Sequence, residues 1–170
     1  MLSSCESRGS QPMATEFSGS GRGFRNLRYH RWQTRLLLVT SLVMLGTATF
    51  ACFSGQYVTA TFGSLSSVAS LNYWRAPGIS LRRDIDVILA VACLVYFLLA
   101  ACLLTGFSFV SAWSFFAAFG YCFRKSWIIA ATTEDTWAKW HACGHIAISL
   151  AATSVILGEG DNWLLRRTSQ

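Results

Sequence analysis

The sequence predicts an all-α protein, a polytopic bundle of membrane-spanning helices joined by short loops. Hydrophobic residues make up 53% of the 170 positions and charged residues only 13%, a balance too apolar for an ordinary water-soluble domain. Residues 36–53 and 141–157 are apolar runs that approach the roughly 20 residues needed to cross about 30 Å of hydrocarbon. Composition and run length therefore both indicate an integral membrane protein.

A longer apolar run lies in the middle of the chain, where residues 87–123 contain no charged side chain. A single straight helix of that length, at about 1.5 Å per residue, would be nearly twice as long as the hydrocarbon core is thick. The run must therefore fold back on itself. Gly and hydroxyl residues interrupt it at 105–108, so we expect the turn there.

A segment rich in serine and threonine, residues 57–74, decides between four and five helices. Hydropathy alone leaves it open, because the segment has no charge but many hydroxyl groups. Lys and Arg collect in the short loops on the cytoplasmic or matrix side. Four crossings would divide these residues eight against six between the two sides, whereas five crossings divide them twelve against two. The charges therefore predict five helices, with four as the runner-up, near residues 36–53, 57–74, 85–104, 108–130 and 140–157.

The same topology sets the organisation of the chain. We expect residues 1–34 to form a flexible basic tail rich in Ser, Gly and Arg, residues 35–158 one transmembrane helical domain, and residues 159–170 a short polar tail. The N-terminus is expected on the cytoplasmic or matrix side and the C-terminus on the opposite side. The composition of the first tail is also typical of an organelle-targeting segment, so the identity of the membrane stays open.

The end of the N-terminal tail carries a basic face. If residues 24–35 are helical, the spacing places four arginines on one side of that helix, namely Arg25, Arg28, Arg31 and Arg35. Such a face suits anionic lipid headgroups, and an ordinary positive-inside anchor accounts for the same residues. The expected partners are the lipid bilayer, its anionic headgroups and other membrane protein subunits, and nothing in the sequence indicates nucleic acid binding.

A polar stripe repeats every four residues along the last predicted helix and consists of His141, His145, Ser149 and Thr153. An ionisable group at membrane depth is costly unless it is paired or hydrated, so we expect the stripe to face the bundle. A second stripe, of small residues, permits close approach of another helix. The five-helix topology also brings Ser70 and Asp86 to the same end of the bundle as the two histidines.

Three interpretations of the histidine pair stay open. Both rings can bond to neighbouring helices, they can take part in a proton-linked contact, or they can share a metal ion such as zinc. In the metal interpretation His141 and His145 are ligands, Asp86 is a third ligand or general base, and Ser70 supports it.

This pattern resembles the CREST superfamily of membrane hydrolases, which includes alkaline ceramidases, progestin and adiponectin receptors, and GPI-anchor remodelling factors. Their signature is Ser followed four residues later by His, then Asp early in the next helix, and H-x-x-x-H in the last. Here SLNYW is similar to the first element with Trp74 in the place of His, Asp86 is similar to the second, and HACGH (His141 to His145) to the third. The resemblance implies a zinc-dependent lipid amide or ester hydrolase. The missing third histidine and the five helices, against seven in the family, depart from it.

Two functions therefore compete. The first is a small membrane protein without catalysis, acting through helix packing as an accessory or structural component of a membrane assembly and needing no cofactor. The alternative is the CREST-like hydrolase, with zinc as its cofactor and its site at the inner face. Whether the protein is an enzyme is left open by the sequence.

Overall fold

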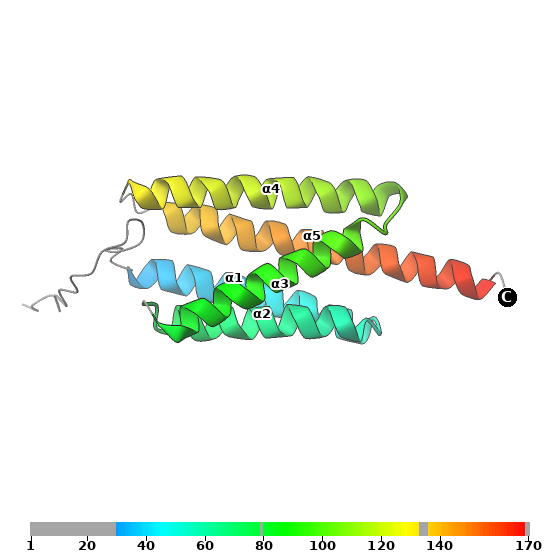
Figure 1. Ribbon diagram of the computed structural model, residues 1–170, viewed down its shortest axis with the longest axis horizontal. Coiled ribbons are helices and arrows are strands. Elements are labelled where there is room, and N and C mark those ends of the chain that lie inside the picture. The colour runs from blue at the N-terminus through cyan, green and yellow to red at the C-terminus, as the bar shows by residue number, and fades with distance from the viewer. Residues whose placement is uncertain (1–29, 79, 133–135, 169–170) are drawn as a thin grey trace, which may run out of the picture.

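The computed structural model describes residues 30–78, 80–132 and 136–168, with side chains described as far as Glu159. Within these residues the chain forms five helices and no strand: α1 (Arg31–Phe53), α2 (Tyr57–Arg75), α3 (Leu81–Ala101), α4 (Gly106–Ala131) and α5 (Trp137–Thr168). The prediction of an all-α bundle of five helices is confirmed. Figure 1 shows the helices and their order along the chain.

Local sequence signals explain where several helices begin and end. The backbone N–H of His30 donates to Gln33 Oε1 over 2.9 Å, which satisfies a backbone group at the start of α1. Glycines with positive φ occupy the turn between α1 and α2 and the turn between α3 and α4, with φ at 77° for Gly55 and 60° for Gly106. A left-handed residue allows the chain to reverse at little steric cost. The second of these turns lies within the segment predicted to interrupt the long apolar run.

The helix bounds differ from the predicted ones chiefly at the polar ends. Helix α3 begins at Leu81 instead of residue 85, because charged residues form its first turn. Helix α5 starts at Trp137 and continues to Thr168, well beyond the predicted end at residue 157. A helix need not stop where the apolar residues stop, since its backbone hydrogen bonds are satisfied within the helix.

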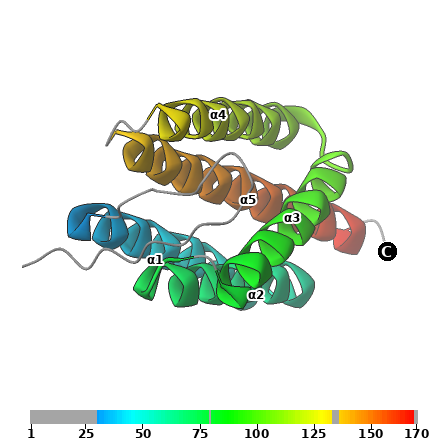
Figure 2. The ribbon, with the colours of Figure 1, turned by 60° about the vertical axis from the view of Figure 1, so that its left-hand side comes forward.

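The helices pack as two hairpins and a crossing helix. Helix α4 lies along α5, α5 packs against α1, and α1 lies along α2, while α3 crosses α2 obliquely (Figures 1 and 2). The C-terminal half of α3 reaches α4 and α5 through a buried apolar cluster that includes Phe97, Phe116 and Val155. Along the rest of their lengths α3 and α4 diverge.

Four of the helices are long and apolar enough to cross a membrane: Arg31–Phe53, Leu81–Ala101, Gly106–Ala131 and Trp137–Glu159. These four fit a multi-pass membrane protein. Helix α2 falls short in hydropathy because of its hydroxyl residues, yet it runs beside α1 and its 19 residues extend over about 28 Å. Its buried residues include Thr59, Ser66, Ser67 and Ser70, so these four hydroxyl groups face the neighbouring helices.

One end of the bundle gathers the described cations. The start of α1, the end of α2, the start of α3, the end of α4 and the start of α5 all lie at this end (Figure 1). We call it the basic end, because it carries every Lys and Arg whose side chain is described: Arg31, Arg35, Arg75, Arg82, Arg83, Arg124, Lys125 and Lys139. The C-terminus of α5, with Arg166 and Arg167, lies at the other end.

Candidate functional site

The polar stripe of α5 faces the bundle, as its spacing predicts. His145 is buried at 9% exposure, and its ring Nδ1 lies 2.9 Å from Thr40 Oγ1 on α1. Thr40 also donates a hydrogen bond of 3.2 Å to the backbone carbonyl of Leu37. A hydroxyl has one proton and a carbonyl only accepts, so both contacts are satisfied together when His145 Nδ1 carries the proton. That tautomer leaves Nε2 as the unprotonated ring nitrogen.

Ser70 and Asp86 also meet, and α1 joins them to the same layer. The Ser70 hydroxyl on α2 lies 3.0 Å from the Ser41 hydroxyl on α1, and the Asp86 carboxyl on α3 lies close to Ser70. Ser41 in turn donates to the Leu37 carbonyl over 2.8 Å. Leu37 thus accepts bonds from both consecutive hydroxyl residues of α1.

These contacts define a polar layer that links four helices and consists of Thr40, Ser41, Ser70, Asp86, His141 and His145. Two of its members, Thr40 and Ser41, were not predicted from the sequence. They supply the hydroxyls that join α1 to α5 and to α2. The four predicted residues therefore meet as two pairs, Ser70 with Asp86 and His141 with His145, and α1 lies between the pairs.

His141 lies among aromatic rings. Its ring centroid is 4.9 Å from that of His145, 5.6 Å from Trp74, 5.8 Å from Phe123 and 6.2 Å from Trp137. These neighbours come from α2, α4 and α5, so this histidine is packed at the junction of three helices. Trp74 contacts His141 edge-on.

The residues that meet here do not complete a zinc site. Structural and catalytic zinc sites use at least three protein ligands. Among the side chains described, no group of three His, Cys, Asp or Glu residues converges so that it could hold a metal ion. His141 and His145 provide two imidazoles from one helix, and the neighbouring ring of Trp74 is an indole, which offers no lone pair to a metal.

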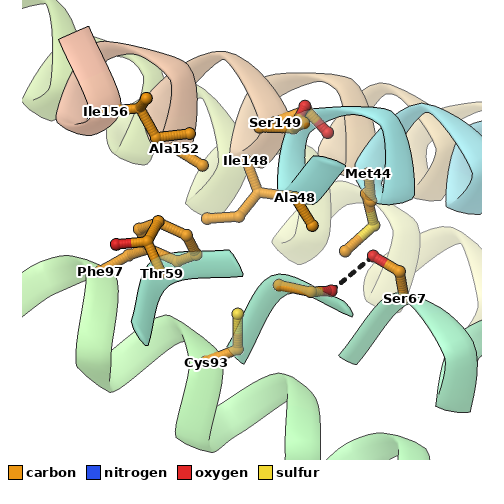
Figure 3. A pocket seen from close by; sticks show the side chains of 12 residues that line it. Met44, Ala48, Thr59, Ser67, Cys93, Phe97, Ile148, Ser149, Ala152 and Ile156 are labelled. Carbon is orange, nitrogen blue, oxygen red and sulfur yellow. Dashed lines mark hydrogen bonds between the residues drawn. The ribbon is translucent and has the colours of Figure 1, made fainter. Parts of the chain in front are cut away.

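A crevice lies deeper in the bundle, between the polar layer and the far end (Figure 3). Its volume is about 30 Å³, and its lining is largely apolar, with Phe97, Ile148 and Ile156 among the residues. The hydroxyls at its wall are already bonded: Ser67 donates to the Gly63 carbonyl over 2.7 Å and Ser149 to the His145 carbonyl over 2.8 Å. A space of this size holds about one water molecule, far less than a lipid substrate.

The small-residue stripe of α5 packs against α4. Ala147 and Ala151 are buried, and Ser154 exchanges a hydrogen bond of 2.9 Å with Ser111 of α4. At Gly158 an added Cβ would lie 2.8 Å from Ser108 Cβ, so the helices approach closely there. The expectation of a helix-packing face is confirmed.

The predicted basic face is described only in part. Arg31 and Arg35 lie on the first turns of α1 and are exposed. Arg25 and Arg28 lie outside the described residues. Comparison of the chain with models of protein families, with curated proteins and with solved structures found no match.

Proposed function

We propose that the protein is a small polytopic membrane protein without catalysis of its own, which acts through helix packing as an accessory or structural component of a membrane assembly. The observation that carries this proposal is that the buried polar side chains form hydrogen bonds with one another and with the helix backbone. The Nδ1 of His145 and the hydroxyls of Thr40, Ser41 and Ser70 all bond within or between helices. Polar groups arranged in this way hold helices together in a bilayer.

The apolar exterior supports the same proposal. Helix α4 contacts little besides α5, and large residues along it stay exposed, among them Phe109 at 41%, Val110 at 60% and Trp127 at 55%. Such a surface faces either lipid or the apolar helices of another subunit. We propose the second for α4, because the described residues cover only the side of α4 that faces α5.

The topology belongs to the same proposal. All five helices cross the bilayer, α2 included, with the basic end on the cytoplasmic or matrix side and the C-terminus opposite. The cations at that end support this orientation, since positive residues are retained on the inner side.

Site-specific photo-crosslinking in native membranes tests the assembly. A benzophenone amino acid in place of Phe109, which is exposed on α4, is expected to give a discrete adduct with another protein. The matched control is Phe116 on the same helix, which is 7% exposed and should link only within the chain. Purification of the protein as a lone monomer in mild detergent, together with lipid adducts alone at Phe109, would contradict the proposal.

A second candidate function is the CREST-like lipid hydrolase, and one observation favours it. In the resemblance to the superfamily, Trp74, His141 and His145 correspond to its three zinc-binding histidines, and the ring centroid of His141 lies 5.6 Å from that of Trp74 and 4.9 Å from that of His145. The described side chains provide no third His, Cys, Asp or Glu ligand beside the two histidines, which argues against the hydrolase. Elemental analysis of the purified protein separates the two, since one zinc per chain, lost on His141→Ala, would favour the hydrolase.

A further inference from the structure

Five side chains from three helices lie at the basic end in two contacting groups, Trp32 with Lys139 and Trp140 with Tyr121 and Lys125. Lys139 Nζ on α5 lies 6.0 Å from the ring centroid of Trp32 on α1. The neighbouring Trp140 meets Tyr121 of α4 with ring centroids 5.8 Å apart, and Lys125 Nζ lies 5.9 Å from the Tyr121 ring centroid. Lys139 and Trp140 are consecutive residues of α5, so the two groups lie next to each other, and we call the five residues together the aromatic–basic belt.

The belt lies on the surface of the bundle. Trp32 is 41% and Tyr121 55% exposed, Lys139 is exposed, and Trp140 and Lys125 are half-buried. Each lysine is held over an aromatic face, which orients its ammonium group without neutralising its charge. Neither lysine is ion-paired with a described carboxylate, whereas Arg83 at the same end pairs with Asp84.

The chemistry of the belt matches one region of a bilayer. Tryptophan and tyrosine prefer the level of the headgroups, where their rings meet hydrocarbon and their N–H or O–H groups meet polar atoms. Lysines at that level attract the phosphates of anionic lipids. The exposed Arg31 and Arg35 of α1 add further positive charge at the same end.

We propose that the aromatic–basic belt binds the headgroups of anionic phospholipids in the leaflet that surrounds the basic end. The negatively charged phosphates of these lipids contact Lys139 and Lys125, and the rings of Trp32, Trp140 and Tyr121 pack against the glycerol and upper acyl region. This surface extends the anionic-lipid prediction from the tail arginines to α4 and α5. It concerns the outer surface of the bundle and is independent of what the polar layer does inside.

Quenching of tryptophan fluorescence by brominated lipid tests the proposal. The protein is reconstituted into phosphatidylcholine vesicles with a fixed fraction of either brominated phosphatidylglycerol or brominated phosphatidylcholine. Quenching is expected to be stronger with the anionic lipid, and the ratio of the two association constants measures the selectivity. The Lys125→Gln/Lys139→Gln variant should lower this ratio by up to about five-fold for each charge removed. High salt should lower it as well.

Matched variants locate the effect. The charge-keeping Lys125→Arg/Lys139→Arg variant should retain the selectivity. Trp32→Phe/Trp140→Phe should lower the selective quenching and leave the part due to Trp127, which is 55% exposed near the end of α4, whereas Trp113→Phe, near the start of α4 and away from the basic end, should leave it intact. Equal quenching by the two lipids would overturn the proposal, as would selectivity that survives the loss of both lysines. A salt-sensitive complex with an acidic protein, without lipid selectivity, would also overturn it.

Discussion

Substitution of Gly63 by alanine tests the packing of α1 against α2. An ideal Cβ at residue 63 would lie 2.9 Å from the Cβ of Ala48, closer than real Cβ atoms come. Ala48 Cβ is fixed to its own backbone and cannot rotate away, so the two helices must separate. Forcing an extra methyl group into a packed interface costs about 1–3 kcal/mol of unfolding free energy.

The helix propensity gained by alanine must be separated from this steric cost. Replacement of a helical glycine by alanine gains up to about 1 kcal/mol by itself. Gly46, on α1, provides the matched control, because an added Cβ there meets nothing within 4 Å. Since both substitutions gain similar propensity, Gly63→Ala should be less stable than Gly46→Ala by about 1–3 kcal/mol.

A double-mutant cycle then tests whether the loss of stability comes from the contact between residue 63 and Ala48. Ala48→Gly removes the methyl group that Gly63→Ala would strike, so in its presence Gly63→Ala should become neutral or stabilising. The expected coupling is about 1–3 kcal/mol, measured by reversible unfolding in mixed micelles with circular dichroism. Equal stabilities of the Gly63→Ala and Gly46→Ala variants, or a coupling near zero, would refute the close α1–α2 packing.

Three further predictions concern the other contacts. Thr40→Val should lower the unfolding free energy by about 0.6 kcal/mol, and at most about 1.7 kcal/mol, because it removes the bond to His145, while Thr40→Ser should retain most of the stability in the same assay. Gly158→Ala should cost about 1–3 kcal/mol, because its Cβ would lie 2.8 Å from Leu104 and Ser108; an unchanged stability would mean that α4 and α5 are less tightly packed at this point. The purified protein should contain less than one zinc per chain by elemental analysis, and a stoichiometric amount would favour the hydrolase.

The helices were predictable because each depends on a property of a long segment. Apolar runs gave four of them, and the distribution of Lys and Arg gave α2, whose hydropathy alone leaves it open. The residues at which the helices begin and end were less predictable where those ends are polar. Helix α5 continues beyond Glu159, where its apolar span ends, as far as Thr168. The sequence of this last part has no apolar pattern that would predict where the helix ends.

The polar layer was predictable where spacing fixes a face and unpredictable where it does not. The four-residue interval of His141 and His145 places the two rings on the same face of any α-helix, where they meet edge-on, and the topology placed Ser70 and Asp86 at the same end. Thr40 and Ser41 were missed, because hydroxyl residues in apolar helices commonly bond back to their own carbonyls and so predict no partner. Their position as adjacent hydroxyls within the run Leu36–Leu45 was the available signal.

The sidedness of the two chain ends tests the central claim most directly. Five crossings place the N-terminus and the C-terminus in different compartments. A protease-sensitive tag on each end, assayed in sealed membrane vesicles before and after permeabilisation, reports which end is exposed. We predict that only one tag is cleaved in intact vesicles and that both are cleaved once the membrane is opened. Cleavage or protection of both tags together in intact vesicles would contradict five crossings, because an even number of crossings returns the chain to the side on which it began.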